Sequence, residues 1–152
     1  MDFDELYMQA AIEQAKAGLR RGGIPIGAAL AVDHVIIGLG HNQRIQLSDP
    51  ILHAEMDCLR NAGRLSPDIY RRSTIYTTLS PCAMCTGAIL LFGIPRVVIG
   101  ENQNFMGRED LLANNNVKVE LMKNTEITEI LEEFIKRNSG IWHEDISDSE
   151  SR

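Results

Sequence analysis

Short apolar runs that suit β-strands alternate with helical segments along most of this chain. A first helix, predicted over 3–19, precedes two apolar runs, 27–32 and 35–40, and the connection between them at Asp33-His34 predicts a β-hairpin. Strands and helices then alternate. A helix between two strands is the usual crossover of a parallel pair and leaves helices on both faces of the sheet. The expected fold class is therefore α/β, a three-layer α/β/α sandwich with a five-stranded mixed sheet.

Local start and stop signals predict the remaining boundaries. Ser48-Asp49-Pro50 has the capping side chains and the proline that begin helices, so a helix is predicted from there to about Gly63. Ser80-Pro81 repeats this signal before an almost wholly apolar helix over 82–92, which is expected to be buried inside the protein or against a second subunit. Further strands are expected at 74–79, 96–100 and 117–121, and further helices at 111–114, 126–136 and 141–146.

The size and charge of the chain narrow its organisation and partners. Its 152 residues suit one domain, expected over 1–146, with a disordered tail over 147–152. The net charge is −6, and a nucleic-acid partner is disfavoured because phosphate binding normally needs a basic face. No apolar run reaches the ~18 residues of a membrane span, and the first residues do not resemble a signal peptide. We therefore expect a cytoplasmic protein that makes no membrane contact.

The three cysteines indicate metal or redox chemistry, because their odd number in such a chain does not suit a disulfide framework. Cys82 and Cys85 have C-x-x-C spacing at the start of a predicted helix, whose dipole stabilises thiolates. With His53, they supply three ligands and leave a fourth position for water, as in catalytic zinc sites. Cys58 lies more than a turn beyond His53 on another side of the helix, so it is expected to be a small buried core residue.

Glu55 follows His53 by two positions, so the two side chains diverge by ~200° around a regular helix. It is expected to reach a water or substrate beside the metal. A carboxylate there can take a proton from a zinc-activated water and deliver it to a ring nitrogen and a leaving amine, which is hydrolytic deamination. The alternatives are a redox C-x-x-C pair, which leaves the His-x-Glu motif unexplained, and a structural zinc in a binding module, which usually has four protein ligands.

These motifs carry a family resemblance. His53-Ala54-Glu55 followed by Pro81-Cys82-Ala83-Met84-Cys85 matches the H-x-E…P-C-x-x-C signature of zinc-dependent deaminases. Over almost the whole chain, the sequence resembles the fungal-type (yeast-like) cytosine deaminases, within the cytidine/deoxycytidylate deaminase superfamily. The segments that carry this closer resemblance are 22–27, 40–42, 76–89, 93–96, 100–105 and 142–146.

The resemblance implies a homodimer that hydrolyses free cytosine to uracil and ammonia, with one Zn²⁺ per subunit and pyrimidine salvage as its role. Zinc-bound hydroxide would be the nucleophile and Glu55 the proton shuttle. The metal ligands would be His53, Cys82 and Cys85. Pyrimidine contacts would come from Asn42, the Ala54 backbone N–H, the Ser80 carbonyl, Asp145, Phe105, Trp142 and Ile26, while the helix over 141–146 closes the pocket.

The chain also departs from the family pattern. His143 replaces an aromatic Phe of the terminal helix, Asp57-Cys58 replaces a Ser-Thr pair, and the stretch over 106–117 differs. None of these positions is an expected zinc ligand, but pocket lining is open to change. Alternative substrates are therefore guanine, 5-methylcytosine, isocytosine and tRNA adenosine. The acidic tail and the absence of a basic surface disfavour the tRNA substrate.

Overall fold

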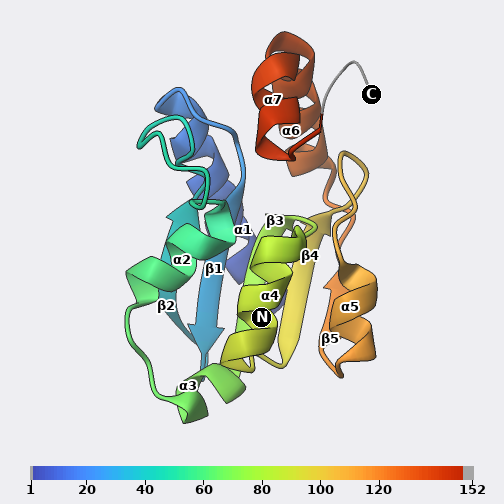
Figure 1. The fold of residues 1–152 in the computed structure, drawn as a ribbon. Coiled ribbons are helices and arrows are strands. Elements are labelled where there is room, and N and C mark those ends of the chain that lie inside the picture. Colours follow the sequence, from blue (N-terminus) through green and yellow to red (C-terminus); the bar gives the residue numbers. More distant parts are fainter. Residues whose placement is uncertain (1, 149–152) are drawn as a thin grey trace.

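The computed structural model describes residues 2–148, which form a five-stranded mixed sheet with helices on both faces (Figure 1). The expected fold class is confirmed. Each predicted strand is present, and most helix ends fall within two residues of their predicted positions. The elements in chain order are α1 Phe3–Arg20, β1 Gly27–Val32, β2 Val35–His41, α2 Ala54–Ala62, α3 Pro67–Arg71, β3 Ser73–Leu79, α4 Ala83–Phe92, β4 Arg96–Glu101, α5 Glu109–Asn114, β5 Lys118–Leu121, α6 Thr125–Arg137 and α7 Ser139–Asp145.

The sheet has the strand order β2-β1-β3-β4-β5. β1 pairs antiparallel with both β2 and β3, whereas β3, β4 and β5 run parallel to one another. The hairpin turn places His34 at the surface, as expected, where its ring stacks on Phe3. The helices α4 and α5 make the crossovers between the parallel strands, so the local alternation of helix and strand does account for the sheet.

Alternating residues of the strands build two separate hydrophobic cores. Ala29, Tyr76 and Val98 face α1, whereas Leu30, Val97 and their same-face neighbours belong to the core beneath α2 and α4. Figure 1 shows α2 and α4 in front of the sheet and α1 behind it. This period of two, with apolar residues on both faces, is what a sheet covered on both sides requires.

One end of the sheet gathers the chemistry-bearing segments. The parallel strands β3 and β4 end there at Leu79 and Glu101, and α2 and α4 begin nearby. The helices α6 and α7 lie beyond this same end in Figure 1. Crevices outside the carboxyl ends of parallel strands are where α/β sheets bind ligands.

The predicted helix start at Ser48-Asp49-Pro50 is wrong. The segment forms turns, and α2 begins only at Ala54 with His53 as its N-cap residue. Ser48 has a φ of 50°, in the left-handed region, and the Asp49 carboxylate accepts a hydrogen bond from the Ile51 N–H at 2.9 Å. Asp49 therefore caps a local turn instead of a helix, which is the competition that short polar side chains offer.

The apolar helix α4 is only half covered in a single chain. Cys85, Thr86 and Ile89 are buried, but Leu91 is 79% exposed. The predicted burial is therefore right for one side of the helix. In the predicted tail, Ser147 and Asp148 are described, while 149–152 lie outside the described residues. Within residues 2–148, no helix is both long enough and apolar enough to cross a membrane.

Replacing Asp4 with asparagine is expected to lower the free energy of unfolding by about 1 kcal/mol at pH 7. Arg96 donates to both Asp4 carboxylate oxygens, at 2.9 and 2.5 Å, and these bonds hold the pKa of Asp4 below its usual range. The lowered pKa means that this stabilisation is present above the unfolded-state pKa of ~3.9 and is lost as pH falls through the folded-state pKa. Denaturant unfolding from pH 7 to 3 should show the two proteins converging in acid, whereas the exposed Glu5→Gln control should match the parent throughout.

Candidate active site and metal centre

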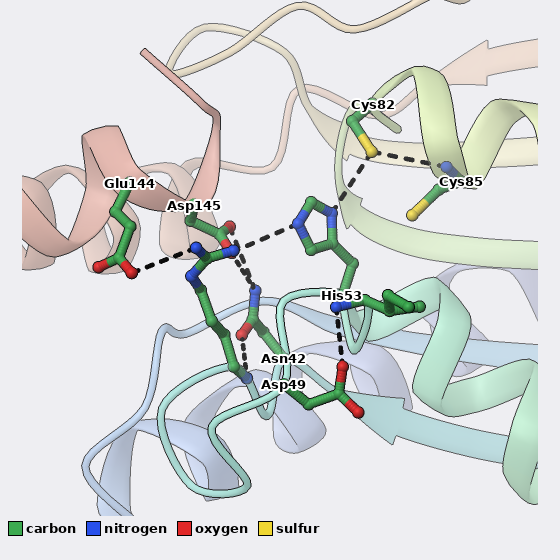
Figure 2. A network of polar contacts seen from close by, with 9 residues as sticks. Asn42, Asp49, His53, Cys82, Cys85, Glu144 and Asp145 are labelled. Carbon is green, nitrogen blue, oxygen red and sulfur yellow. Dashed lines mark hydrogen bonds and ion pairs between the residues drawn. The ribbon is translucent and has the colours of Figure 1, made fainter. Parts of the chain in front are cut away.

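Three side chains from two helix starts converge on one point. His53 and Cys82 are the N-cap residues of α2 and α4, and Cys85 lies in the first turn of α4. Their ligand atoms all lie within 4.8 Å of one another, and His53 Nδ1 is 3.4 Å from Cys82 Sγ (Figure 2). The prediction that Cys58 stays apart from this group is confirmed, because its thiol is fully buried in the core.

The donor set fits a zinc ion. Zn–S distances near ~2.3 Å and Zn–N distances near ~2.0 Å need ligand atoms about 3.5–4 Å apart around a tetrahedral centre. The pKa of Cys82 falls to about 4, chiefly through the Cys85 hydrogen bond and despite burial, with His53 contributing further. Burial opposes a charged His53 ring, but hydrogen bonds to Asp145 and Cys82 outweigh it and raise the pKa to about 11. Surroundings that favour a positive charge here also favour a metal cation in place of the proton.

The second ring nitrogen of His53 is held by the far end of the chain. His53 Nε2 lies 3.3 Å from an Asp145 carboxylate oxygen, and Asn42 Nδ2 donates to the same carboxylate at 3.3 and 3.4 Å (Figure 2). The Asp145 side chain is only 2% exposed. A carboxylate on the outer nitrogen of a ligating histidine fixes ring orientation and raises ligand basicity. Asp145 can therefore orient His53, in addition to the substrate contact predicted for it.

Glu55 stands beside this cluster as a buried carboxyl group. It lies in the first turn of α2 and is 4% exposed. Burial raises its pKa to about 7, although the nearby His53 works in the opposite direction. A carboxyl group whose pKa lies near the working pH can both accept and return a proton, which is the property that general acid–base catalysis needs.

A small cavity lies between the cluster and α7. Its lining includes the metal-facing His53 and Cys82, together with Glu55. Of the residues expected to contact a base, all but one line it: Ile26, Ala54, Ser80, Phe105, Trp142 and Asp145. The exception is Asn42, which is fully buried behind Asp145. Leu79 and Ile146 complete the apolar part of the wall and were not predicted.

Two acidic residues that sequence reasoning missed position this wall. The Glu109 carboxylate accepts a 2.6 Å hydrogen bond from the Ser80 hydroxyl, which itself accepts from the Gly107 N–H at 2.9 Å. Glu101 is 1% exposed and accepts from the backbone N–H groups of Gln103 and Asn104, at 2.7 and 3.1 Å. These bonds shape the loop that carries Phe105. Their only sequence signal is the position of Glu101 at the end of a strand.

Gly107 shows how tightly this loop approaches the cysteine segment. A Cβ atom at this position would lie 1.7 Å from the Pro81 carbonyl oxygen, and Arg108 donates its N–H to that oxygen at 3.1 Å. The glycine is therefore required by a close backbone approach rather than by an unusual φ. The contact joins the Phe105 loop directly to the residue before Cys82.

Comparison with known proteins agrees with the chemistry of the cluster. Residues 1–101 match the family model for the cytidine and deoxycytidylate deaminase zinc-binding region. The chain is 50% identical to a cytosine deaminase from Candida albicans, over 97% of this chain and 100% of the relative. It is also 40% identical to a tRNA-specific adenosine deaminase from Streptococcus pyogenes, over 69% of this chain and 67% of the relative.

A solved structure shares the fold. It comes from a study of tRNA:A34 deaminases that edit the wobble position of transfer RNA, and it superposes with a TM-score of 0.72 at 27% identity. The match covers 84% of this chain and 99% of the solved chain. The family model spans both His53-Ala54-Glu55 and the Cys82/Cys85 pair. The chain therefore belongs to the cytidine and deoxycytidylate deaminase family, whose zinc-binding region includes this cluster.

Proposed function

We propose that this protein hydrolyses free cytosine to uracil and ammonia. The observation that carries the proposal is a cavity lined by His53 and Cys82 of the metal cluster together with Glu55, with Trp142 and Asp145 of α7 in its wall. The 50% identity to a cytosine deaminase over 97% of the chain supports the choice of base. The predicted homodimer and cytoplasmic location stay predictions.

His53, Cys82 and Cys85 would hold the zinc ion. Zinc at such a site lowers the pKa of a coordinated water to about 7 and polarises the group that it contacts. Glu55 would take a proton from the attacking water and pass it to the ring nitrogen N3 while the water oxygen bonds to C4. Glu55 would then carry the second proton of that water, now on the new C4 hydroxyl group, to the exocyclic amino group. The bond between C4 and the amino nitrogen would break, releasing ammonia and leaving the C4 carbonyl of uracil. Burial of the Glu55 carboxyl group raises its pKa, which favours a side chain that can both accept and return a proton.

The remaining residues would recognise a flat pyrimidine. Phe105 and Trp142 offer aromatic faces, and Ile26 contributes an apolar floor. Asp145 and the Ser80 carbonyl would accept hydrogen bonds from an exocyclic amine, which selects an amino group over a carbonyl. Asn42 is locked by its bonds to Asp145 and to the Arg44 N–H, so its approach to the O2 edge would require a small shift of Asp145.

Covering of the cavity by α7 favours a free base over a nucleoside or an RNA. Trp142 is 4% exposed and Asp145 5% exposed, so both lie within the closed wall. The ribose of a bound nucleoside would have to project through this wall, and an anticodon loop would have to displace the wall. A tRNA-specific adenosine deaminase matches only 69% of the chain. Adenosine in a tRNA stem-loop is therefore included among the substrates tested below.

The deciding measurement is ammonia release from cytosine, 5-methylcytosine, isocytosine, guanine, adenine, cytidine and a tRNA anticodon stem-loop. We expect cytosine to have at least a 100-fold higher kcat/KM than cytidine, because α7 would have to close over the bound base and a sugar on that base would obstruct the closure. Following the cytosine absorbance gives an independent rate. A faster reaction with cytidine or the stem-loop would contradict the free-base proposal, and bound zinc without any ammonia release would favour the structural-zinc alternative.

A further inference from the structure

The cavity beside the metal cluster is closed too tightly to admit a base without movement. It encloses about 20 Å³, little more than the ~10–15 Å³ that one water molecule needs. An adjoining, more open cavity of about 480 Å³ lies outside it, and both share His53, Cys82, Phe105, Asp145 and Ile146 as walls. A wall must therefore open for substrate to enter, and again for product to leave.

The helix α7 is the wall best placed to open. It has seven residues, follows α6 closely and ends the described chain within a few residues. Trp142 packs the apolar side of the helix against the core, while Asp145 makes direct contacts with Asn42 and His53. Trp142, Ile141 and Ile146 pack against the core, but a helix of seven residues is too short to be stable by itself, so its polar contacts help to keep it docked.

Arg44 supplies the polar contact that reaches α7 from outside the cavity. Its guanidinium lies 3.2 Å from Glu144 and 3.9 Å from Asp145. The Arg44 side chain is 17% exposed and that of Glu144 62%, so this pair borders solvent, whereas Asp145 is 2% exposed. Figure 2 shows Glu144 and Asp145 side by side at the end of α7, both joined by dashed lines to the same network. One arginine therefore contacts two successive acids of the helix.

The backbone of Arg44 is tied to the same network. Its N–H donates to Asn42 Oδ1 at 2.9 Å, which directs the Asn42 amide nitrogen toward Asp145. The sequence position of Arg44, two residues after Asn42, makes both contacts possible at once. Movement of the Arg44 loop would therefore disturb the Asn42 amide as well as the docking of α7.

We propose that Arg44 is a positioning residue that latches α7 over the cavity through Glu144 and Asp145, and that release of this latch admits substrate and frees product. The expected effect on kinetics rests on the proposed function, because it assumes that cytosine is the substrate. The contact of Arg44 with α7 is present without substrate and can be tested independently. Because the Arg44–Glu144 pair borders solvent, salt weakens it, while the buried contacts of Asp145 remain.

The test compares Glu144→Gln and Arg44→Met with the control Glu133→Gln, which removes a similarly exposed acid from an ion pair with Arg137 on α6. Hydrogen exchange of the backbone amides of residues 140–146 is measured without substrate. We expect exchange about threefold faster in Glu144→Gln, about tenfold faster in Arg44→Met, and unchanged in the control. In 1 M NaCl the exchange rate of the parent should approach that of Glu144→Gln. The exchange rate of Glu144→Gln itself should not respond to salt.

Steady-state kinetics with cytosine adds the functional readout. In Glu144→Gln, we expect KM to rise about fivefold while kcat stays at or above the parent value, because the chemical groups are intact and product leaves more easily. Unchanged exchange over 140–146 in Glu144→Gln would overturn the latch, and this surface substitution is informative even if Arg44→Met does not fold. If exchange responds as expected but the parent deaminates no base, the latch stands and the proposed function fails.

Discussion

Replacing Glu55 with glutamine is expected to lower kcat for cytosine by about 1,000-fold while the fold and the zinc content stay unchanged. Glutamine keeps the size of the side chain but cannot accept a proton, and Glu55 is the buried carboxyl group of the cavity whose pKa is raised to about 7. Initial rates of ammonia release give kcat, metal analysis gives the zinc content, and thermal unfolding checks the fold.

Asp57→Asn is the matched control for Glu55→Gln. Asp57 lies in the same helix and is 1% exposed, but its carboxylate accepts hydrogen bonds from the His41 N–H and from the Gln43 side chain rather than facing the cavity. We expect this substitution to lower the melting temperature and to leave kcat within about fivefold of the parent, since buried hydrogen bonds affect stability. A Glu55→Gln variant with more than a tenth of the parent kcat would contradict the proton shuttle. Loss of zinc from it would place Glu55 among the ligands.

The metal cluster could be predicted because its geometry is local. Cys82 and Cys85 stand three residues apart at a helix start, and that spacing alone turns both sulfurs toward one side. His53 is also at a helix start, although the predicted start was placed too early. For predicting the metal cluster, the spacing of the ligands near a helix start was therefore more informative than the exact residue at which the helix begins.

The polar network around the cluster could not be predicted in this way. Arg44 and Glu144 are 100 residues apart in the sequence, and Ser80 and Glu109 are 29 apart. Such pairs depend on how loops pack at one end of the sheet, and no periodicity records that packing. The family resemblance predicts that Asp145 contacts the substrate. The contact between Asp145 and His53 is seen only when the packing of α7 is known.

The errors in secondary structure have a common physical origin. The sequence around Asp49 predicts a helix cap, but its carboxylate caps a turn, and this residue type allows either outcome. The short helix α3 was missed although Ser66-Pro67 has the same cap-then-proline pattern, and the Ser66 side chain does accept from the Ile69 N–H. Tertiary packing decides which of these signals begins a helix.

Replacing Cys85 with alanine is expected to reduce bound zinc from about one ion per chain to less than about 0.1, and to abolish turnover with it, because two protein ligands hold zinc much more weakly than three. The sulfur of Cys85 lies within 4.8 Å of the ligand atoms of His53 and Cys82, so no other described thiol can replace it from its present position. Metal analysis after gel filtration measures the zinc, and ammonia release measures turnover.

Cys58→Ala separates metal binding from packing, because Cys58 and Cys85 are both 0% exposed and lose the same atom. Either substitution removes a buried sulfur, so each is expected to cost about 1–2 kcal/mol of stability through packing. A chelator should further destabilise the parent and Cys58→Ala, since bound zinc stabilises the folded state by mass action, but it should leave Cys85→Ala unchanged. Equal zinc loss in both variants would contradict the assignment of His53, Cys82 and Cys85 as the ligands. Removal of a buried thiol outside the cluster would then have the same effect on zinc binding as removal of a ligand.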